Sequence, residues 1–362
     1  MIPAIADRIP LVRRPKAPGL PLAERIAHLT ALAVPPADAG HRDLVARASG
    51  VLNYAALIAS DVGMPDLAAE LCWRQHRVFA DAGHLTGDIA VMALMPMVNL
   101  ARLLIREGDG DAGYEVLERL YRAGQQRGSA EIRDRRVDLS VLTGTDADHR
   151  KICEELWVSV LIDGARALAR TGRWTEAAET MTAHRGVGNR LLDGRQIAIM
   201  SLMERGLDRQ ARAMIDTSIP AEPWENAIAA LLRAHCRPRR HDRDIVLRET
   251  LPALIPPDPT TAVFQARVGL AALDLGHEES DATTQVRSAL AGVAALDAYA
   301  ARDVLNHGPT RSRLASREIR KLQAVLGVSG LGIGSLSAAH MQPLTAAVCN
   351  AEAALRRQLW PG

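Results

Sequence analysis

Aromatic residues are scarce in this sequence and make up 3% of its 362 positions. Proteins that bind single-stranded nucleic acid stack bases on aromatic side chains, so this scarcity argues against that class. The net charge of +2 argues in the same direction, because nucleic-acid-binding domains carry a strong basic excess. Lysine is scarce as well, and we attribute the excess of arginine over lysine to genome composition. Nucleic acid is therefore not an expected partner.

Cysteine pairs and long apolar runs are also missing. The four cysteines lie far apart without a Cys-x-x-Cys pair, which argues against a disulfide framework and against a structural zinc site. No uninterrupted apolar run approaches the roughly 20 residues that a membrane span needs. The first residues lack the order of a secretory signal, because the basic residues follow apolar stretches that proline interrupts. We therefore expect a cytoplasmic protein that binds no membrane.

Motifs that would carry catalysis are absent: there is no HExxH, GxSxG, Walker or DxxD pattern. His235, Cys236, His241 and Asp242 could offer metal ligands, but arginines surround them, and their positive field opposes a divalent cation. We interpret this cluster as a solvated basic turn. The glycines of residues 327–335 fail the spacing of a phosphate loop and indicate a hinge. We predict no catalytic residue, no metal site and no cofactor.

Helical patterns dominate what is present. Segments rich in Ala, Leu and Arg carry apolar residues at positions i, i+3 and i+4, and short breaks with Gly or Pro separate them. Strand patterns are almost missing, so the fold class is all-α. The later breaks fall at Gly172, at Gly206, near Arg240 and at Gly276, close to a 34-residue period. Such a period is typical of an elongated array of helical repeats.

One repeat unit shows the pattern most clearly. Gly164 precedes the turn of residues 172–174 and Ala177 follows it, and such small residues let paired helices approach closely. In this respect residues 43–296 resemble the tetratricopeptide-repeat family, although Asp281 occupies a small-residue position in a later unit. The resemblance implies an α-solenoid of antiparallel helix pairs, in which the first helix of each pair lines a concave groove.

The predicted organisation has three consecutive parts. Residues 1–42 form a proline-rich segment with a short helix, residues 43–327 form the solenoid, and residues 328–362 form a glycine-rich hinge followed by a capping helix. The apolar face of that last helix must be covered, so it either caps the solenoid or mediates oligomerisation. Residues 128–149 are polar and break the period, which predicts an inserted loop or small hairpin. We interpret it as a surface excursion and keep a lid as the alternative.

Polar residues at helical spacing suggest where a ligand would bind. Glu155, Ser159 and Asp163 follow one another at intervals of four, and Arg166 comes three residues later, so they share one helical face. The alternative is that this face is simply the solvated side of an amphipathic helix. A second group at a helix start carries two arginines that could clamp a carboxylate or phosphate. The full set of candidate ligand-binding residues is Asn53, Asn99, Arg102, Glu155, Ser159, Asp163, Arg166, Arg190, Asp193 and Arg195.

These features predict a non-catalytic binding or scaffold protein. A concave helical groove would hold a peptide, a protein segment or a small anionic metabolite. The alternative is an enzyme or biosynthetic accessory protein in which Glu155 and Asp163 carry out acid–base chemistry and arginines bind the substrate. We favour the non-catalytic function because two carboxylates two helical turns apart are a generic pattern.

Overall fold

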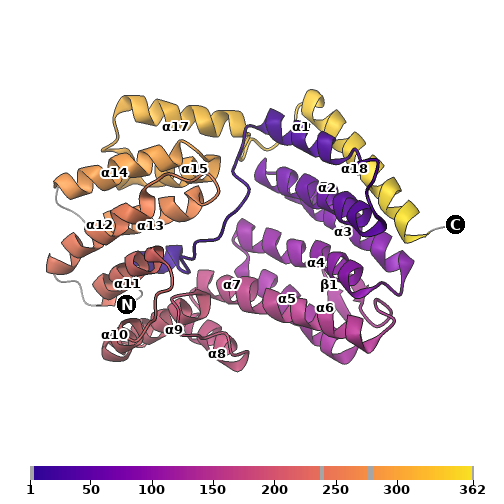
Figure 1. The fold of residues 1–362 in the computed structure, drawn as a ribbon, viewed down its shortest axis with the longest axis horizontal. Coiled ribbons are helices and arrows are strands. Elements are labelled where there is room, and N and C mark those ends of the chain that lie inside the picture. The colour runs from indigo at the N-terminus through magenta and orange to yellow at the C-terminus, as the bar shows by residue number, and fades with distance from the viewer. Residues whose placement is uncertain (1–3, 237–239, 276–279, 361–362) are drawn as a thin grey trace. The chain divides into compact units, whose positions relative to one another are not determined.

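Helices make up most of the structure. The computed structural model describes residues 4–236, 240–275 and 280–360, apart from the side chains of residues 240–244. Among these residues the only sheet is a two-stranded hairpin, so the predicted all-α class is confirmed (Figure 1).

The chain divides into two compact units, and each unit is made of two separate stretches of sequence. Unit 1 contains Met1–Pro21 and Leu168–Ser329, and unit 2 contains Leu22–Ala167 and Gly330–Gly362. The sequence predicted consecutive parts instead. Local periodicity does not reveal which distant segments fold together, because it reports only contacts within one helix or between sequence neighbours.

Unit 2 is a stack of helices in which each helix packs on the next one along the chain. Its elements are α1 (Leu22–Leu32), α2 (His41–Asp61), α3 (Pro65–Ala82), α4 (Gly87–Glu107), α5 (Gly110–Gln126), β1 (Ser129–Ile132), β2 (Arg135–Asp138), α6 (Asp146–Ser159), the π-helical turn η2 (Val160–Gly164) and α18 (Ala338–Leu359). In addition, α2 packs on α4 and α4 packs on α6. The antiparallel strands β1 and β2 form a hairpin within the region where the sequence predicted a loop or hairpin.

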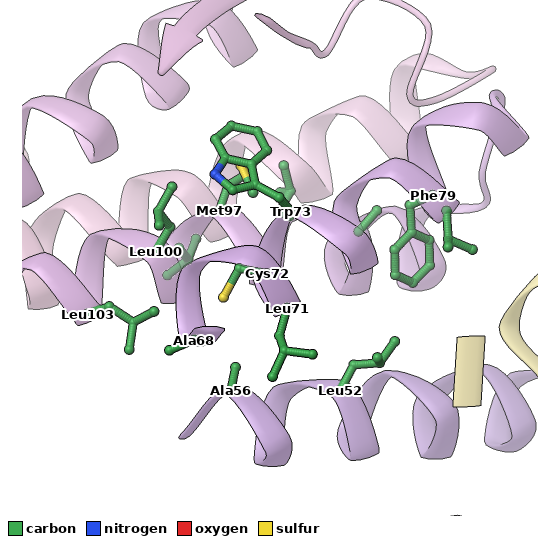
Figure 2. Packing of buried hydrophobic residues seen from close by; sticks show 14 of the residues in the cluster. Leu52, Ala56, Ala68, Leu71, Cys72, Trp73, Phe79, Met97, Leu100 and Leu103 are labelled. Atoms are coloured by element: carbon green, nitrogen blue, oxygen red, sulfur yellow. The ribbon is translucent and has the colours of Figure 1, made fainter. Parts of the chain in front are cut away.

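The core of unit 2 lies between α2, α3 and α4. Figure 2 shows Leu71 of α3 facing Leu52 and Ala56 of α2, and Trp73 of α3 beside Met97 of α4. All of these side chains are buried. Burying one leucine side chain stabilises a fold by about 1.5–3 kcal/mol, so this layer contributes a large part of the stability of the unit.

Helix α4 is the most apolar element of that layer. Among the described residues it is the one helix whose length and composition would allow it to cross a membrane. Of its most apolar window, 67% is buried inside the protein, which is how the core helix of a helical protein also behaves.

The C-terminal helix α18 packs on α1, α2 and α3. Its apolar face, with Leu344, Val348 and Leu355, is buried there. Other helices of the same chain therefore cover the apolar face that we expected to need a partner. An ion pair between Arg74 of α3 and Glu352 of α18, at 2.7 Å, adds a polar contact between these two helices.

Truncating the apolar face of α18 tests this docking. We expect Leu355→Ala to lower the free energy of unfolding by about 2–5 kcal/mol, because it removes a fully buried side chain and leaves a cavity. The matched control is Asn350→Ala on the exposed face of the same helix, which should change it by less than about 0.5 kcal/mol. Urea unfolding followed by circular dichroism measures both, and equal midpoints would contradict the docking.

A buried histidine makes the stability of unit 2 depend on pH. His76 of α3 is buried, with its ring edge-on to Trp73 at 5.9 Å between centroids, and burial lowers its pKa to about 4, although Asp81 partly opposes this. In the unfolded chain a histidine titrates near 6.5. Its neutral form therefore stabilises the fold fully above pH 6.5, and this contribution is lost as the pH falls towards 4.

We expect His76→Leu to flatten the stability profile between pH 6.5 and 4.5. One such group changes the unfolding free energy by at most about 1.4 kcal/mol per pH unit. His84 is exposed, so His84→Leu should keep the slope of the wild type. Urea midpoints measured at several pH values decide the matter, and a His76→Leu slope equal to that of the wild type would refute it.

Within unit 1, too, most helices pack on the next helix along the chain. Its elements are η1 (Ala4–Arg8), α8 (Trp174–Ala183), α9 (Asp193–Glu204), α10 (Asp208–Asp216), α11 (Pro223–Cys236), α12 (Arg240–Leu254), α13 (Ala262–Leu275), α14 (Asp281–Ala294), α15 (Ala298–Asn306), α16 (Gly308–Arg311) and α17 (Ser316–Ser329). From α8 to α15 each helix packs on the next, and α13 also packs on α11 and α15. The chain passes from unit 2 into unit 1 within α7 (Ala165–Arg170).

Two of the predicted breaks coincide with observed helix ends. Gly172 follows α7 and Gly206 follows α9, and both have a positive φ, at 79° and 72°, which glycine adopts without strain. The predicted break at Gly276 lies outside the described residues. Near Arg240 the described backbone is already helical, and residues 237–239 lie outside the description.

Candidate functional site

Four of the candidate residues form one connected polar ladder in unit 2. Asn99 of α4 donates from Nδ2 to Oδ1 of Asn53 on α2, at 3.1 Å. Arg102 of α4 donates from Nη1 to Oδ1 of Asn99, at 3.2 Å, and from Nε to Oδ2 of Asp163 on η2, at 2.8 Å. The ladder therefore links α2, α4 and η2.

Local structure explains why these side chains meet. Asn99 and Arg102 are three residues apart on α4, so they lie on one helical face. Asp163 projects from the π-helical turn, whose hydrogen bonds join residues i and i+5 rather than i and i+4 as in an α-helix. Gly164, at the end of that turn, lies against the ring of Tyr114 on α5, where a Cβ atom would come within 3.3 Å. The small residue therefore allows η2 to sit close to α5.

The π-helical turn also corrects the predicted stripe. Ser159 is only 2% exposed, so it is not available to a ligand on the face where Asp163 lies. Glu155 and Arg166 are half-buried. The prediction assumed an unbroken α-helix, and the π turn changes the angular spacing between residue 159 and residue 163. Within the described part of the chain, Glu155 makes no hydrogen bond to the ladder.

Arg102 is the group of the ladder that faces solvent. Its side chain is 44% exposed, whereas Asp163 is 14% exposed. Its Nε and Nη1 atoms are bound within the ladder, and no acceptor among the described residues binds its Nη2 atom. Arginine is suited to binding carboxylates and phosphates because its guanidinium presents several N–H donors in a fixed plane. One edge of this guanidinium is thus held in place while donors remain for a ligand.

A second arginine network lies one helical turn further along α4. Arg106 donates to Oδ1 of Asp61, and Arg25 of α1 donates to Oδ2 of the same carboxylate, at 2.6 Å. Asp61 and Arg25 are buried, and Arg106 is partly exposed. The two networks together thus hold three arginines and two carboxylates. This balance favours an anionic rather than a cationic ligand.

The other candidates lie in unit 1, and Arg190 binds protein carboxylates there. It donates from Nη2 to Glu225 at 2.6 Å and to Glu222 at 3.1 Å. Glu225 is fully buried and also accepts from the backbone N–H of Leu191. Burial raises the pKa of Glu225, but hydrogen bonds from Arg190 and from backbone N–H groups outweigh it, so the pKa lies below its usual value.

Arg195 and Asp193 are likewise engaged within unit 1. Arg195 is buried and donates to backbone carbonyls at Met214 and Gly188 and to two hydroxyls at the end of α10. Burial lowers its pKa below the usual arginine value. Asp193 accepts two hydrogen bonds from Arg14 of the N-terminal segment. These contacts tie loops and helix ends together.

Only part of the predicted basic turn lies within the described residues. The side chains of His241 and Asp242 lie outside the described residues. His235 is half-buried, and burial lowers its pKa to about 4, although Asp274 partly opposes this. Among the described residues, no group of three or more histidine, cysteine, aspartate or glutamate side chains could hold a metal ion.

Sequence reasoning missed several polar side chains with long-range partners, notably Asp61, Gln196, Asp274 and Asp297. Each is bound to a residue far away in sequence, as in the pairs Arg25–Asp61 and Arg8–Asp274. The one signal that the sequence offered for such a contact is an aspartate on a largely apolar stretch of helix, as Asp61 is on α2.

Comparison with protein-family models, with curated proteins and with solved structures finds no match to this chain.

The tight packing beside Asp193 can be tested with two glycines. A Cβ atom at Gly194 would lie 2.2 Å from the backbone oxygen of Gly186, whereas one at Gly188 would meet nothing within 4 Å. Gly194→Ala should therefore destabilise the protein by about 1–3 kcal/mol, despite the higher helix propensity of alanine. Gly188→Ala, the control in the loop that precedes α9, should stay within about 0.5 kcal/mol of the wild type. Thermal unfolding that ranks the two variants the other way would show this packing to be wrong.

Proposed function

We propose that the protein is a non-catalytic binding protein, and that the polar face over α2, α4 and η2 holds an anionic group of its ligand. The observation that carries this proposal is the ladder from Asn53 through Asn99 to Arg102 and Asp163. It fixes the orientation of one exposed guanidinium. A preoriented arginine loses less conformational entropy on binding than a free one does.

The architecture supports a binding role of this kind. Each helix packs on the next, and α2, α4 and α6 pack on one another in turn. We infer that these helices form a solenoid of antiparallel pairs, similar to tetratricopeptide repeats, with α2, α4 and α6 as the first helices. In such a solenoid the first helices line the concave groove. The proposed ligand is a peptide, a protein segment or a small metabolite that carries a carboxylate or phosphate.

The chemistry of the face fits an anion. Arg102 would donate the N–H groups that the ladder leaves unused, those of Nη2 included, to two ligand oxygens. Asp163 keeps the guanidinium plane fixed. The amides of Asn53 and Asn99 add polar groups beside it without adding charge. Glu155 and Asp163, the pair considered for acid–base work, are not joined by a hydrogen bond, and Asp163 is engaged by Arg102. The enzyme alternative therefore stays a prediction from sequence.

Arg102 provides the test. Small molecules released by denaturing the protein purified from its own host would be identified by mass spectrometry, and the anionic ones titrated back by calorimetry. We expect Arg102→Gln to weaken binding about 10- to 100-fold, because a hydrogen bond to a charged group contributes about 1.5–3 kcal/mol. The matched control is Arg122→Gln, an exposed arginine on α5 whose ion pair is with Glu118 one turn away.

The control should leave the affinity within about twofold. Equal affinity of Arg102→Gln and the wild type for every ligand that binds would exclude this face as the binding site. A peptide ligand should also lose affinity when its terminal carboxylate is amidated, if that carboxylate is the group that Arg102 holds.

A further inference from the structure

The N-terminal segment of unit 1, residues 4–21, is bound by the helices as an extended peptide would be. After the short helix η1 it has no regular secondary structure up to Pro21. Prolines at positions 10, 15 and 18 remove backbone N–H groups and prevent a helix or a strand ladder. In Figure 1 the start of this indigo segment lies beside the helices of unit 1, and η1 packs on α13. Side chains from several of these helices hold it.

Gln196 of α9 binds the backbone of this segment directly. Its Oε1 accepts from the N–H of Leu11 at 2.7 Å, and its Nε2 donates to the C=O of Leu11 at 2.8 Å. A side-chain amide that both donates to and accepts from one residue imitates the pairing of two β-strands. It therefore recognises an extended backbone whatever side chain that residue carries.

Asp297 holds the other end of the segment. Its Oδ2 accepts from the N–H of Gly19 at 2.6 Å, and its Oδ1 caps α15 by accepting from the N–H of Ala300. A Cβ atom at Gly19 would lie 3.0 Å from the ring of Tyr299, so the backbone approaches α15 closely. Between these two points, the N–H of Lys16 donates to the C=O of Thr260 at 2.8 Å.

Charge complementarity adds to the backbone contacts. Arg8 pairs with Asp274, Arg13 with Asp258 and Arg14 with Asp193. Three acidic side chains from the helices of unit 1 and the loops between them thus face three arginines of the segment. Arg13 and Arg14 remain partly exposed, whereas Asp193 is buried, so solvent and a competing segment reach these ion pairs from the side of the arginines.

Apolar anchors lie beside the arginines in the same segment. Ile5, Ile9 and Leu11 are buried. Backbone hydrogen bonds that give affinity, with pockets for particular side chains that give specificity, are the usual way to bind an extended peptide. Each of these components is present along residues 5–19.

We propose that unit 1 carries a groove for extended, proline-containing, arginine-bearing peptide segments, that the chain's own residues 5–19 fill it, and that such a segment of a partner protein replaces them on binding. Charge complementarity and the bound segment itself define the partner: apolar residues in the places of Ile9 and Leu11, and arginines in the places of Arg8 and Arg14. The proposal is independent of the anion site in unit 2.

Competition with the tethered segment sets the expected affinity. A segment attached to its own groove has an effective concentration of the order of millimolar, so an identical free peptide binds weakly while the groove is filled. The apparent dissociation constant falls as the fraction of empty grooves rises. A segment without helix or sheet hydrogen bonds of its own can detach by local opening while the remaining helices stay folded.

The experiment uses the full chain and a fluorescein-labelled peptide with the sequence of residues 4–21. A double variant, Arg8→Asp with Leu11→Asp, loosens the tethered segment and leaves the groove unaltered. Fluorescence anisotropy should show that this variant binds the peptide at least tenfold more tightly than the wild type does. Adding Gln196→Leu to the double variant should cost at least tenfold again. The control is a peptide that carries the same two aspartate substitutions, which should not bind.

Three results would overturn the proposal. The first is a double variant with unchanged circular dichroism that binds the peptide no more tightly than the wild type. Where the double variant fails to fold, the wild type with excess unlabelled peptide replaces it, and unchanged hydrogen exchange of residues 5–19 is then the refuting result. The third is a concentration-dependent dimer of the wild type, seen by light scattering, in which labelled residues 5–19 exchange between copies and the free peptide never competes. That result would make a second copy the occupant.

Discussion

The carboxylate of Asp61 is the contact on which the arrangement of unit 2 depends. It is fully buried and is bound by Arg25 of α1 and Arg106 of α4, while the backbone oxygen of the same residue accepts from the N–H of Gly332. One residue at the end of α2 thus joins two other helices and the turn that leads into α18. Removing one partner of a buried ion pair costs about 3–5 kcal/mol, because the remaining charge stays desolvated. Neither α1 nor α4 can shift without that cost, and the backbone hydrogen bond from Gly332 holds the C-terminal return to the same residue.

The same constraint fixes the candidate site. Arg106 anchors α4 to Asp61, and Arg102 stands one turn earlier on the same helix with 44% of its side chain exposed. Two arginines four residues apart therefore have different roles, and the role of each depends on how deeply the carboxylate that it binds is buried. Arg106 serves the fold because its carboxylate lies inside the protein. Arg102 keeps free donors because Asp163 reaches it only from the edge of the π-helical turn.

The sequence predicted what depends on local periodicity and failed where distant segments meet. The all-α class, the turns at Gly172 and Gly206 and the hairpin region follow from spacing that neighbouring residues determine. The contact of Asn99 with Arg102 follows for the same reason. Ser159 was misplaced because no residue pattern announces a π turn. The discontinuous units and the role of Gln196 depend on pairs that lie far apart in sequence, such as Leu11 and Gln196 with a separation of 185 residues, and a single sequence carries no signal for such pairs.

The N-terminal segment belongs to unit 1, but in the sequence it is separated from the rest of unit 1 by residues 22–167 of unit 2. Its binding partners, from Asp193 to Asp297, all follow α1 to α6 in the sequence, so residues 4–21 cannot make these contacts until α9, α13 and α15 have been synthesised. Prolines and arginines suit that state, because they oppose premature helix formation and collapse. The contacts of the segment are thus made only with helices and loops that follow it in the chain. A surface that must capture an extended segment already in solution has the backbone acceptors, acidic groups and apolar pockets needed to capture another of the same chemistry.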